Sequence, residues 1–174
     1  DIYYQIGLVY CKNPAASEYE SLSVYVPGAY MKGTPNADGT YTCQISDKGK
    51  VGEYTARTAP VIMPVNTGGY AAQKAPSSYA PKGLNTYLSQ GFVYVFAGCR
   101  GRDNGTNPDG TAFDGGAPWG VTDLKAAVRY LRYNDSFLPG NKNCIFTFGH
   151  SGGGAQSALM GATGDLSLIH ISEP

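Results

Sequence analysis

The chain has 174 residues and a formal net charge of zero, from 13 Lys and Arg residues against 13 Asp and Glu residues. This balance predicts neither nucleic-acid binding nor a polybasic membrane anchor, and no run approaches the ~18 apolar residues of a membrane span. Only 15% of residues are charged, and the 24 glycines and 14 tyrosines indicate one turn-rich globular domain.

The cysteines do not have the spacing of a metal or redox motif. They are Cys11, Cys43, Cys99 and Cys144. No pair shows C-x-x-C spacing, which argues against zinc and thioredoxin-like sites. Cys99 and Cys144 lie in apolar runs, so we expect them to be small buried side chains. A disulfide and the cellular compartment stay open, with a secreted or cell-associated location favoured over the cytoplasm.

Two strands are predicted near the start of the chain, followed by a polar segment. Apolar and aromatic runs at Ile2–Tyr10 and Ser21–Val26 are typical of strands. Residues 31–58 are polar and rich in glycine, and Asp38-Gly39 between flanking threonines and tyrosines predicts a hairpin. We therefore expect residues 31–58 to form a hairpin-like excursion from the domain.

The middle of the chain alternates strands with a helix. A short buried strand is expected at residues 61–63, and the loop Asn66–Gly69 follows it. Residues 79–90, which end before Gly91, favour a helix with a glycine stop. The continuous apolar run at residues 92–97 predicts a strand that is buried on both faces.

The clearest helix follows a long loop at residues 98–120. Val121, Leu124, Val128 and Leu131 recur at helical spacing and predict one apolar stripe. The run at residues 144–148 predicts another strand, which turns into a small-residue helix ending near residue 162. Strands that alternate with helices imply an α/β fold with a mostly parallel sheet flanked by helices.

The last nine residues look foreign to the protein. Leu166–Pro174 resembles, in one reading frame, the translation of a transposase adapter used in sequencing libraries. An ordinary strand-like ending is the alternative. The adapter interpretation leaves residues 1–165 as the N-terminal part of a single domain, truncated after the last predicted helix, and it excludes His170 as a catalytic base.

A serine motif stands at the junction of the last strand and helix. Residues 149–153 read Gly-His-Ser-Gly-Gly, the G-x-S-x-G pattern of a nucleophile elbow. This placement would expose Oγ of Ser151 above the sheet, with Gly149 and Gly153 leaving room for the neighbouring strand and helix. The N–H of Gly152 would then donate to the oxyanion of a tetrahedral intermediate. A plain glycine-rich turn is the alternative.

The other groups of such a site are harder to identify. His150 lies on the same sharp turn as Ser151, so we expect a structural histidine, because a base must approach from a separate loop. Gly69 follows the strand at 61–63, where this fold places its second oxyanion donor. An ordinary turn is the alternative for Gly69.

Charged residues near position 100 invite other hypotheses. Asp103, Asn104, Asn107, Asp109 and Asp114 suggest calcium, but the EF-hand register fails, so we expect a solvated loop and no metal or other cofactor.

Two arginines and a tryptophan border this loop. Arg100 and Arg102 could contact an acidic substrate, although an ion pair with Asp123 or Asp103 is the simpler interpretation. Trp119 is expected to pack rather than to bind a ligand.

Several segments in the same order resemble bacterial tannases and their feruloyl-esterase-like relatives in the α/β-hydrolase fold. They are residues 23–27, 68–70, 100–102, 121–133, 138–140, 149–154 and 159–164. The resemblance implies a hydrolase of aromatic-acid esters, with Ser151 as nucleophile and with Gly69 and Gly152 beside the oxyanion. Residues 150–152 read His-Ser-Gly where close tannases are expected to have Thr-Ser-Ala.

The leading hypothesis is a serine carboxylic ester hydrolase that acts on a small-molecule ester through an acyl-enzyme. In this family the triad acid and base follow the nucleophile helix, so this chain alone is expected to be inactive. A serine peptidase of the prolyl-oligopeptidase type is an alternative, because it shares the elbow. A hydrolase-fold binding module without turnover is another.

Overall fold

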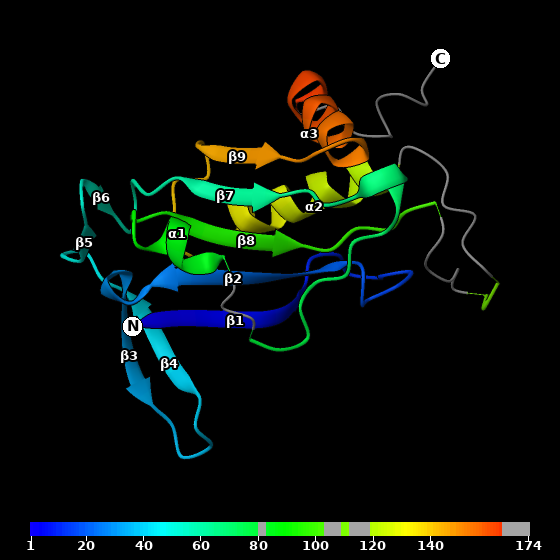
Figure 1. Ribbon diagram of the computed structural model, residues 1–174. Coiled ribbons are helices and arrows are strands. Elements are labelled where there is room, and N and C mark those ends of the chain that lie inside the picture. Colours follow the sequence, from blue (N-terminus) through cyan, green and yellow to red (C-terminus); the bar gives the residue numbers. More distant parts are fainter. Residues whose placement is uncertain (80–82, 103–108, 112–118, 165–174) are drawn as a thin grey trace.

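A five-stranded sheet is the centre of the computed structural model, which describes residues 1–79, 83–102, 109–111 and 119–164 (Figure 1). The strands lie in the order β1-β2-β8-β7-β9. Their bounds are Ile2–Val9 for β1, Ser21–Pro27 for β2, Val93–Ala97 for β8, Val61–Pro64 for β7 and Ile145–Phe148 for β9.

The sheet is mixed. β7 pairs in parallel with both β8 and β9, whereas β2 is antiparallel to β1 and to β8. The expectation of a mostly parallel sheet therefore holds only for the half that carries the serine motif. In that half, β7 and β9 stay paired up to Pro64 and Phe148. The segments that follow these two strands therefore leave the sheet at the same end.

Helices lie on both faces of the sheet (Figure 1). In that view α1 (Leu84–Leu88) lies in front of the sheet and α2 (Trp119–Tyr133) lies behind it, while α3 (Gly152–Thr163) follows β9. Helix α1 is shorter than the predicted 79–90. Its described part begins after Gly83, which has φ of 81° and so interrupts a helix at that point.

The main core lies between the sheet and α2. Leu124 and Leu131 of the predicted stripe are buried there, while Val121 and Val128 at its edges are partly buried. Apolar side chains from all the central strands meet them, and burial of each large one stabilises the fold by about 1.5–3 kcal/mol. The helical stripe predicted from the sequence is thus confirmed as the core-facing side of α2.

Strand β8 is buried more completely on one face than on the other. Val93, Val95 and Ala97 are inaccessible, whereas Tyr94 and Phe96 are half-buried. The expectation of burial on both faces is therefore only partly correct. The reason is that α2 covers one face over a long stretch, while the short α1 covers the other only near Tyr94.

Residues 31–58 form two small hairpins beside the sheet. Their strands are β3 (Met31–Pro35), β4 (Tyr41–Ile45), β5 (Lys50–Val51) and β6 (Tyr54–Thr55). Asp38 stabilises the turn between β3 and β4, because its carboxylate accepts hydrogen bonds from the backbone N–H and the hydroxyl of Thr40. Figure 1 shows this hairpin projecting away from the sheet.

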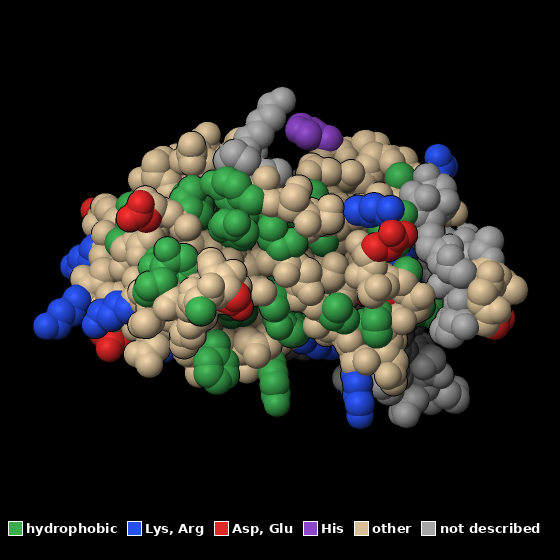
Figure 2. Space-filling model, turned by 90° about the horizontal axis from the view of Figure 1, so that it is seen from below, with side chains coloured by type: hydrophobic (Ala, Val, Ile, Leu, Met, Phe, Trp, Pro, Cys, Tyr) green, Lys and Arg blue, Asp and Glu red, His purple; other side chains and the backbone are tan. Residues whose placement is uncertain are grey.

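The cysteines form no disulfide. All four cysteines are free thiols; Cys99 is buried as expected, whereas Cys144 is only half-buried. On the face seen in Figure 2, hydrophobic side chains gather in the middle and Lys and Arg side chains lie mainly toward the margins. In the described parts of the chain, no helix is long and apolar enough to cross a membrane.

Candidate active site

Ser151 lies at a sharp turn between β9 and α3. Its backbone has φ of 53° and ψ of −122°, and the residue is exposed. A non-glycine residue in such a conformation carries strain of about 1–3 kcal/mol and persists only where the surroundings impose it. This strand–turn–helix geometry is what the G-x-S-x-G motif predicts for a nucleophile elbow.

The glycines beside Ser151 are required by close packing against the end of β7. A Cβ built on Gly149 would lie 2.1 Å from the carbonyl oxygen of Val65, and one on Gly153 would lie 2.0 Å from the same atom. Any side chain at either position would therefore push α3 away from β7. The turn is closed further by a 3.0 Å hydrogen bond from the N–H of Gly153 to the carbonyl of His150.

The turn after β7 lies against the N-terminal end of α3. Residues Gly68–Tyr70 form a 3-10 turn in which Gly69 has φ of 61°. The backbone nitrogen of Gly69 lies 3.4 Å from the position that a Cβ would take on Gly152. Gly152 is the first residue of α3, so its N–H has no acceptor within the helix.

The structure thus brings together Ser151 and the two glycines that the sequence predicts as oxyanion donors. The N–H of Tyr70, in the same turn, already donates to the carbonyl of Thr67 at 2.9 Å. The positive end of the α3 dipole adds to the potential at this point. Two backbone N–H groups beside a strained serine are the arrangement that stabilises a tetrahedral oxyanion.

Two buried glutamines hold the turn in place, and the sequence did not point to either. Gln156 of α3 accepts a 2.5 Å hydrogen bond from the hydroxyl of Thr67. Gln73 accepts one from the N–H of Asn66 at 2.5 Å and donates one to the carbonyl of Ala97 at 2.6 Å. In the sequence, the one signal for Gln156 is that it is a polar residue among small ones in α3. Gln73 lies in a loop, and no motif marks it.

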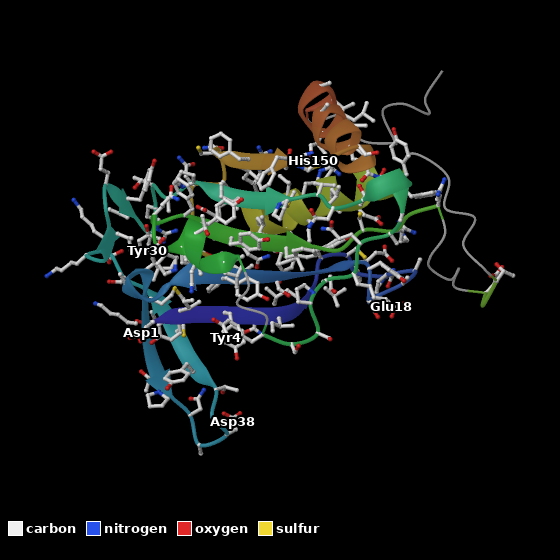
Figure 3. The ribbon with its side chains drawn as sticks, viewed as in Figure 1. Asp1, Tyr4, Glu18, Tyr30, Asp38 and His150 are labelled. Atoms are coloured by element: carbon white, nitrogen blue, oxygen red, sulfur yellow. The ribbon has the colours of Figure 1, made fainter. Side chains whose placement is uncertain are left out.

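His150 precedes the serine and lies where β9 passes into α3 (Figure 3). The side chain is exposed, and its backbone carbonyl is engaged by Gly153. Nothing in this geometry makes His150 a base for Ser151. The chain's other histidine, His170, falls outside the described residues, as does the whole segment 165–174.

Arg100 belongs to a buried ion pair and not to the site. Its guanidinium donates to both carboxylate oxygens of Asp123, at 2.9 and 2.7 Å, and lies 3.6 Å from Glu20 and 5.0 Å from the ring centre of Trp119. The hydrogen bonds with Asp123 raise the pKa of Arg100. The predicted pairing with Asp123 is confirmed, and Trp119 packs against the cation.

The acidic loop lies mostly outside the described residues, which include only 109–111 of it. Asp109 accepts hydrogen bonds from the N–H and the hydroxyl of Thr111, at 3.0 and 2.6 Å, and these lower the pKa of its carboxyl. Within the described ranges, no three His, Cys, Asp or Glu side chains are grouped so that they could hold a metal.

Known proteins are similar to this chain in fold and in sequence. A family model named BD-FAE matches residues 51–171. The tannase of Fusobacterium nucleatum is 34% identical with a TM-score of 0.78, over 98% of this chain and 33% of its own. The tannin acyl hydrolase of Lactobacillus plantarum is 34% identical with a TM-score of 0.77, over 98% of this chain and 35% of its own.

A tannin acyl hydrolase in complex with ethyl gallate is 35% identical with a TM-score of 0.78, again over 98% of this chain and 35% of its own. The chain therefore spans about a third of the length of the tannases it matches. No curated protein matches it. The family-model match over residues 51–171 and the 34% identity to tannases over nearly the whole chain show that the chain belongs to the BD-FAE family of feruloyl-esterase-like domains.

Proposed function

We propose that this chain carries the nucleophile and the oxyanion donors of a serine ester hydrolase that acts on esters of aromatic acids. The observation that carries the proposal is the strained backbone of Ser151, with φ of 53°, between β9 and α3 and beside the turn that contains Gly69. The similarity to tannases supports the choice of ester hydrolysis over other serine chemistry.

In this mechanism Oγ of Ser151 attacks the ester carbonyl and forms a tetrahedral intermediate. The N–H groups of Gly69 and Gly152 donate to the oxygen that becomes negative. Loss of one such donor typically costs about 10²–10³ in kcat. Collapse of the intermediate releases the alcohol and leaves the acyl group on Ser151, and water then hydrolyses the acyl-enzyme.

The base that takes the proton from Ser151 is proposed to lie in sequence beyond this chain. A serine hydroxyl is a weak nucleophile near neutral pH without a base. His150 is next to Ser151 on the turn, and His170 lies in the segment that we expect to derive from an adapter. The proposed unit is therefore the N-terminal part of a larger domain, with the triad acid and base in its remaining part.

The aromatic character of the substrate is proposed from the relatives. Solved tannin acyl hydrolases similar to this chain hold ethyl gallate and 3,4-dihydroxybenzoate. An aromatic acyl group next to the elbow agrees with the exposed aromatic side chains Tyr70 and Phe148 at this end of the sheet. Aryl and alkyl esters of benzoic acids are thus the first substrates to test.

The test is Ser151→Ala in the complete product of the source gene, with release of p-nitrophenol from an aryl ester as the assay. Ser157→Ala is the matched control, because the Ser157 hydroxyl is buried in the same helix and has no hydrogen-bond partner among the described residues. We expect turnover to disappear only in the Ser151 variant. Near-normal turnover by folded Ser151→Ala protein would refute the proposal, and faster cleavage of a matched p-nitroanilide than of the ester would favour a peptidase.

A further inference from the structure

The segment that contains Arg102 is fixed by its backbone against the turn Gly68–Tyr70, which we call the oxyanion turn because it contains Gly69. Gln73 and Cys99 exchange two backbone hydrogen bonds of 2.9 and 2.8 Å, and the N–H of Arg102 donates to the carbonyl of Tyr70 at 3.0 Å. Between these bonds, a Cβ on Gly101 would lie 2.1 Å from the backbone nitrogen of Ala72. The position of Arg102 next to Gly69 is therefore set by tight packing of two chain segments.

The side chain of Arg102 lies over this turn. Its Nη2 atom is 3.5 Å, and its Cζ atom 3.9 Å, from the place that a Cβ would take on Gly69. The residue is nevertheless exposed. A guanidinium group thus borders the proposed oxyanion donor in a residue that is exposed to solvent and ligands.

Arg102 differs in its partners from Arg100, two residues earlier. Arg100 is buried and paired with Asp123 and Glu20. In residues 1–79, 83–102, 109–111 and 119–164, no acidic side chain forms an ion pair with Arg102. Asp103, the partner considered from the sequence, falls outside these ranges.

We propose that Arg102 is a specificity residue that binds a carboxylate carried by the ester, close to the scissile carbonyl. This inference rests on the proposed ester hydrolase function. A guanidinium presents its N–H groups in a planar arrangement that matches the two oxygens of a carboxylate. Its positive charge adds to the partial positive charge at the nearby N-terminal end of α3, and both attract an anion. The substrate class is an ester with a carboxylate on its acyl part or on its alcohol part.

The effect should be moderate, because an exposed ion pair is screened by water. Loss of an exposed ion pair changes the dissociation constant about two- to fivefold. If the bound substrate excludes part of the water around the pair, this change would rise to about tenfold. The contribution should also shrink with salt, since exposed charges are screened over about 8 Å at physiological ionic strength.

The experiment compares Arg102→Gln, Arg102→Lys and the unmodified protein, as complete gene product, on two matched pairs of esters. In one pair the acyl part carries the carboxylate, with the p-nitrophenyl monoester of terephthalic acid set against p-nitrophenyl 4-methylbenzoate. In the other the alcohol part carries it, with the benzoate ester of glycolic acid set against ethyl benzoate. Lys48→Gln is the control, because Lys48 is an exposed cation in the segment between β4 and β5.

We expect Arg102→Gln to lower kcat/KM for the carboxylate ester of one pair about two- to tenfold more than for its neutral match, mainly through KM. Lysine should restore part of the difference, and 0.5 M salt should reduce it in the unmodified protein. Equal losses on charged and neutral esters, or no loss in either pair, would overturn the inference. A failure of the ester hydrolase proposal would give a different result from a failure of the Arg102 inference. In that case the unmodified protein would not hydrolyse the neutral esters, or the Ser151→Ala protein would still hydrolyse them.

Discussion

At the scale of single residues, the site depends on how closely the backbone of α3 approaches its neighbours. The motif in the sequence was sufficient to predict a strained serine at position 151 and the need for glycine at 149 and 153. It was not sufficient to predict the contact between Gly152 and the turn after β7. That contact joins segments more than 80 residues apart, and no local pattern encodes it.

A first prediction concerns Gly152. A Cβ at this position would lie 2.4 Å from the carbonyl oxygen of Thr67 and 2.7 Å from the nitrogen of Tyr70. Close tannases are expected to have alanine at this position, but the turn after β7 leaves no room for it in this chain. Gly152→Ala should therefore displace the turn that carries Gly69 and lower kcat by about 10²–10³, the typical cost of one lost oxyanion donor. Steady-state kinetics on an aryl ester in the complete gene product measures this effect.

Gly161→Ala is the matched control, since Gly161 lies in the same helix and a Cβ there would meet no atom of the described residues within 4 Å. Alanine at 161 should leave kcat unchanged and stabilise the helix by about 0.5–1 kcal/mol. An unchanged kcat in Gly152→Ala protein would show that the turn tolerates the added methyl group, and would contradict the assigned geometry of the oxyanion site.

At the scale of elements, α3 and the turn after β7 act as one unit because a side chain joins them. The hydrogen bond from Thr67 to Gln156 is buried on both sides. The side chain of Gln156 also packs on Gly120 of α2: a Cβ built on Gly120 would lie 2.3 Å from Nε2 of Gln156. Helix α3 is thereby fixed both to the oxyanion turn and to α2.

The second prediction is that Gln156 is a positioning residue for Gly69. Gln156→Met keeps the length of the side chain but removes the acceptor for Thr67. It should destabilise the fold by about 1–3 kcal/mol, the cost of an unpaired buried polar group. It should also lower kcat more than it raises KM, because the displaced donor acts mainly in the transition state.

Chemical denaturation and steady-state kinetics on the same protein separate the two roles. Gln90→Met provides the control, since Gln90 is exposed at the end of α1. Loss of stability with an unchanged kcat, measured well below the melting temperature, would mean that Gln156 is structural only.

Elements with a strong local pattern were predictable, and those that depend on distant partners were not. The stripe of α2 and the glycine turn before α3 follow from periodicity and from residue type. Among the described residues, the helix predicted at 79–90 is limited to Leu84–Leu88, and the left-handed backbone conformation of Gly83 interrupts it at its start. The antiparallel pairing of β2 with β8 could not be predicted, because it joins strands about 70 residues apart.

At the scale of the whole molecule, the sheet has an uncovered region at β9. This strand pairs with β7 on one side, and no described strand pairs with its other side. Phe146 and Phe148 are 53% and 44% exposed on it. An apolar strand with an unpaired edge is a template for association with other chains.

The third prediction is therefore that the 174-residue chain, expressed alone, self-associates and has no esterase activity above background. Size-exclusion chromatography and an aryl-ester assay test the two parts. Phe146→Lys places a charge on the exposed strand and should increase the monomer fraction without restoring activity. A monodisperse monomer that hydrolyses the ester in a Ser151-dependent manner would contradict the proposal that the base lies beyond this chain.

The most direct test of the central proposal is to trap the acyl group on Ser151. The complete gene product is mixed with a slowly deacylating p-nitrophenyl benzoate, quenched in acid within one turnover and digested for mass spectrometry. We predict a benzoyl group on the peptide that contains Ser151, formed together with a burst of p-nitrophenol, and its absence in Ser151→Ala protein. Steady hydrolysis with an unmodified Ser151 peptide at every quench time, or a benzoyl group on another residue, would contradict the assignment of Ser151 as the nucleophile.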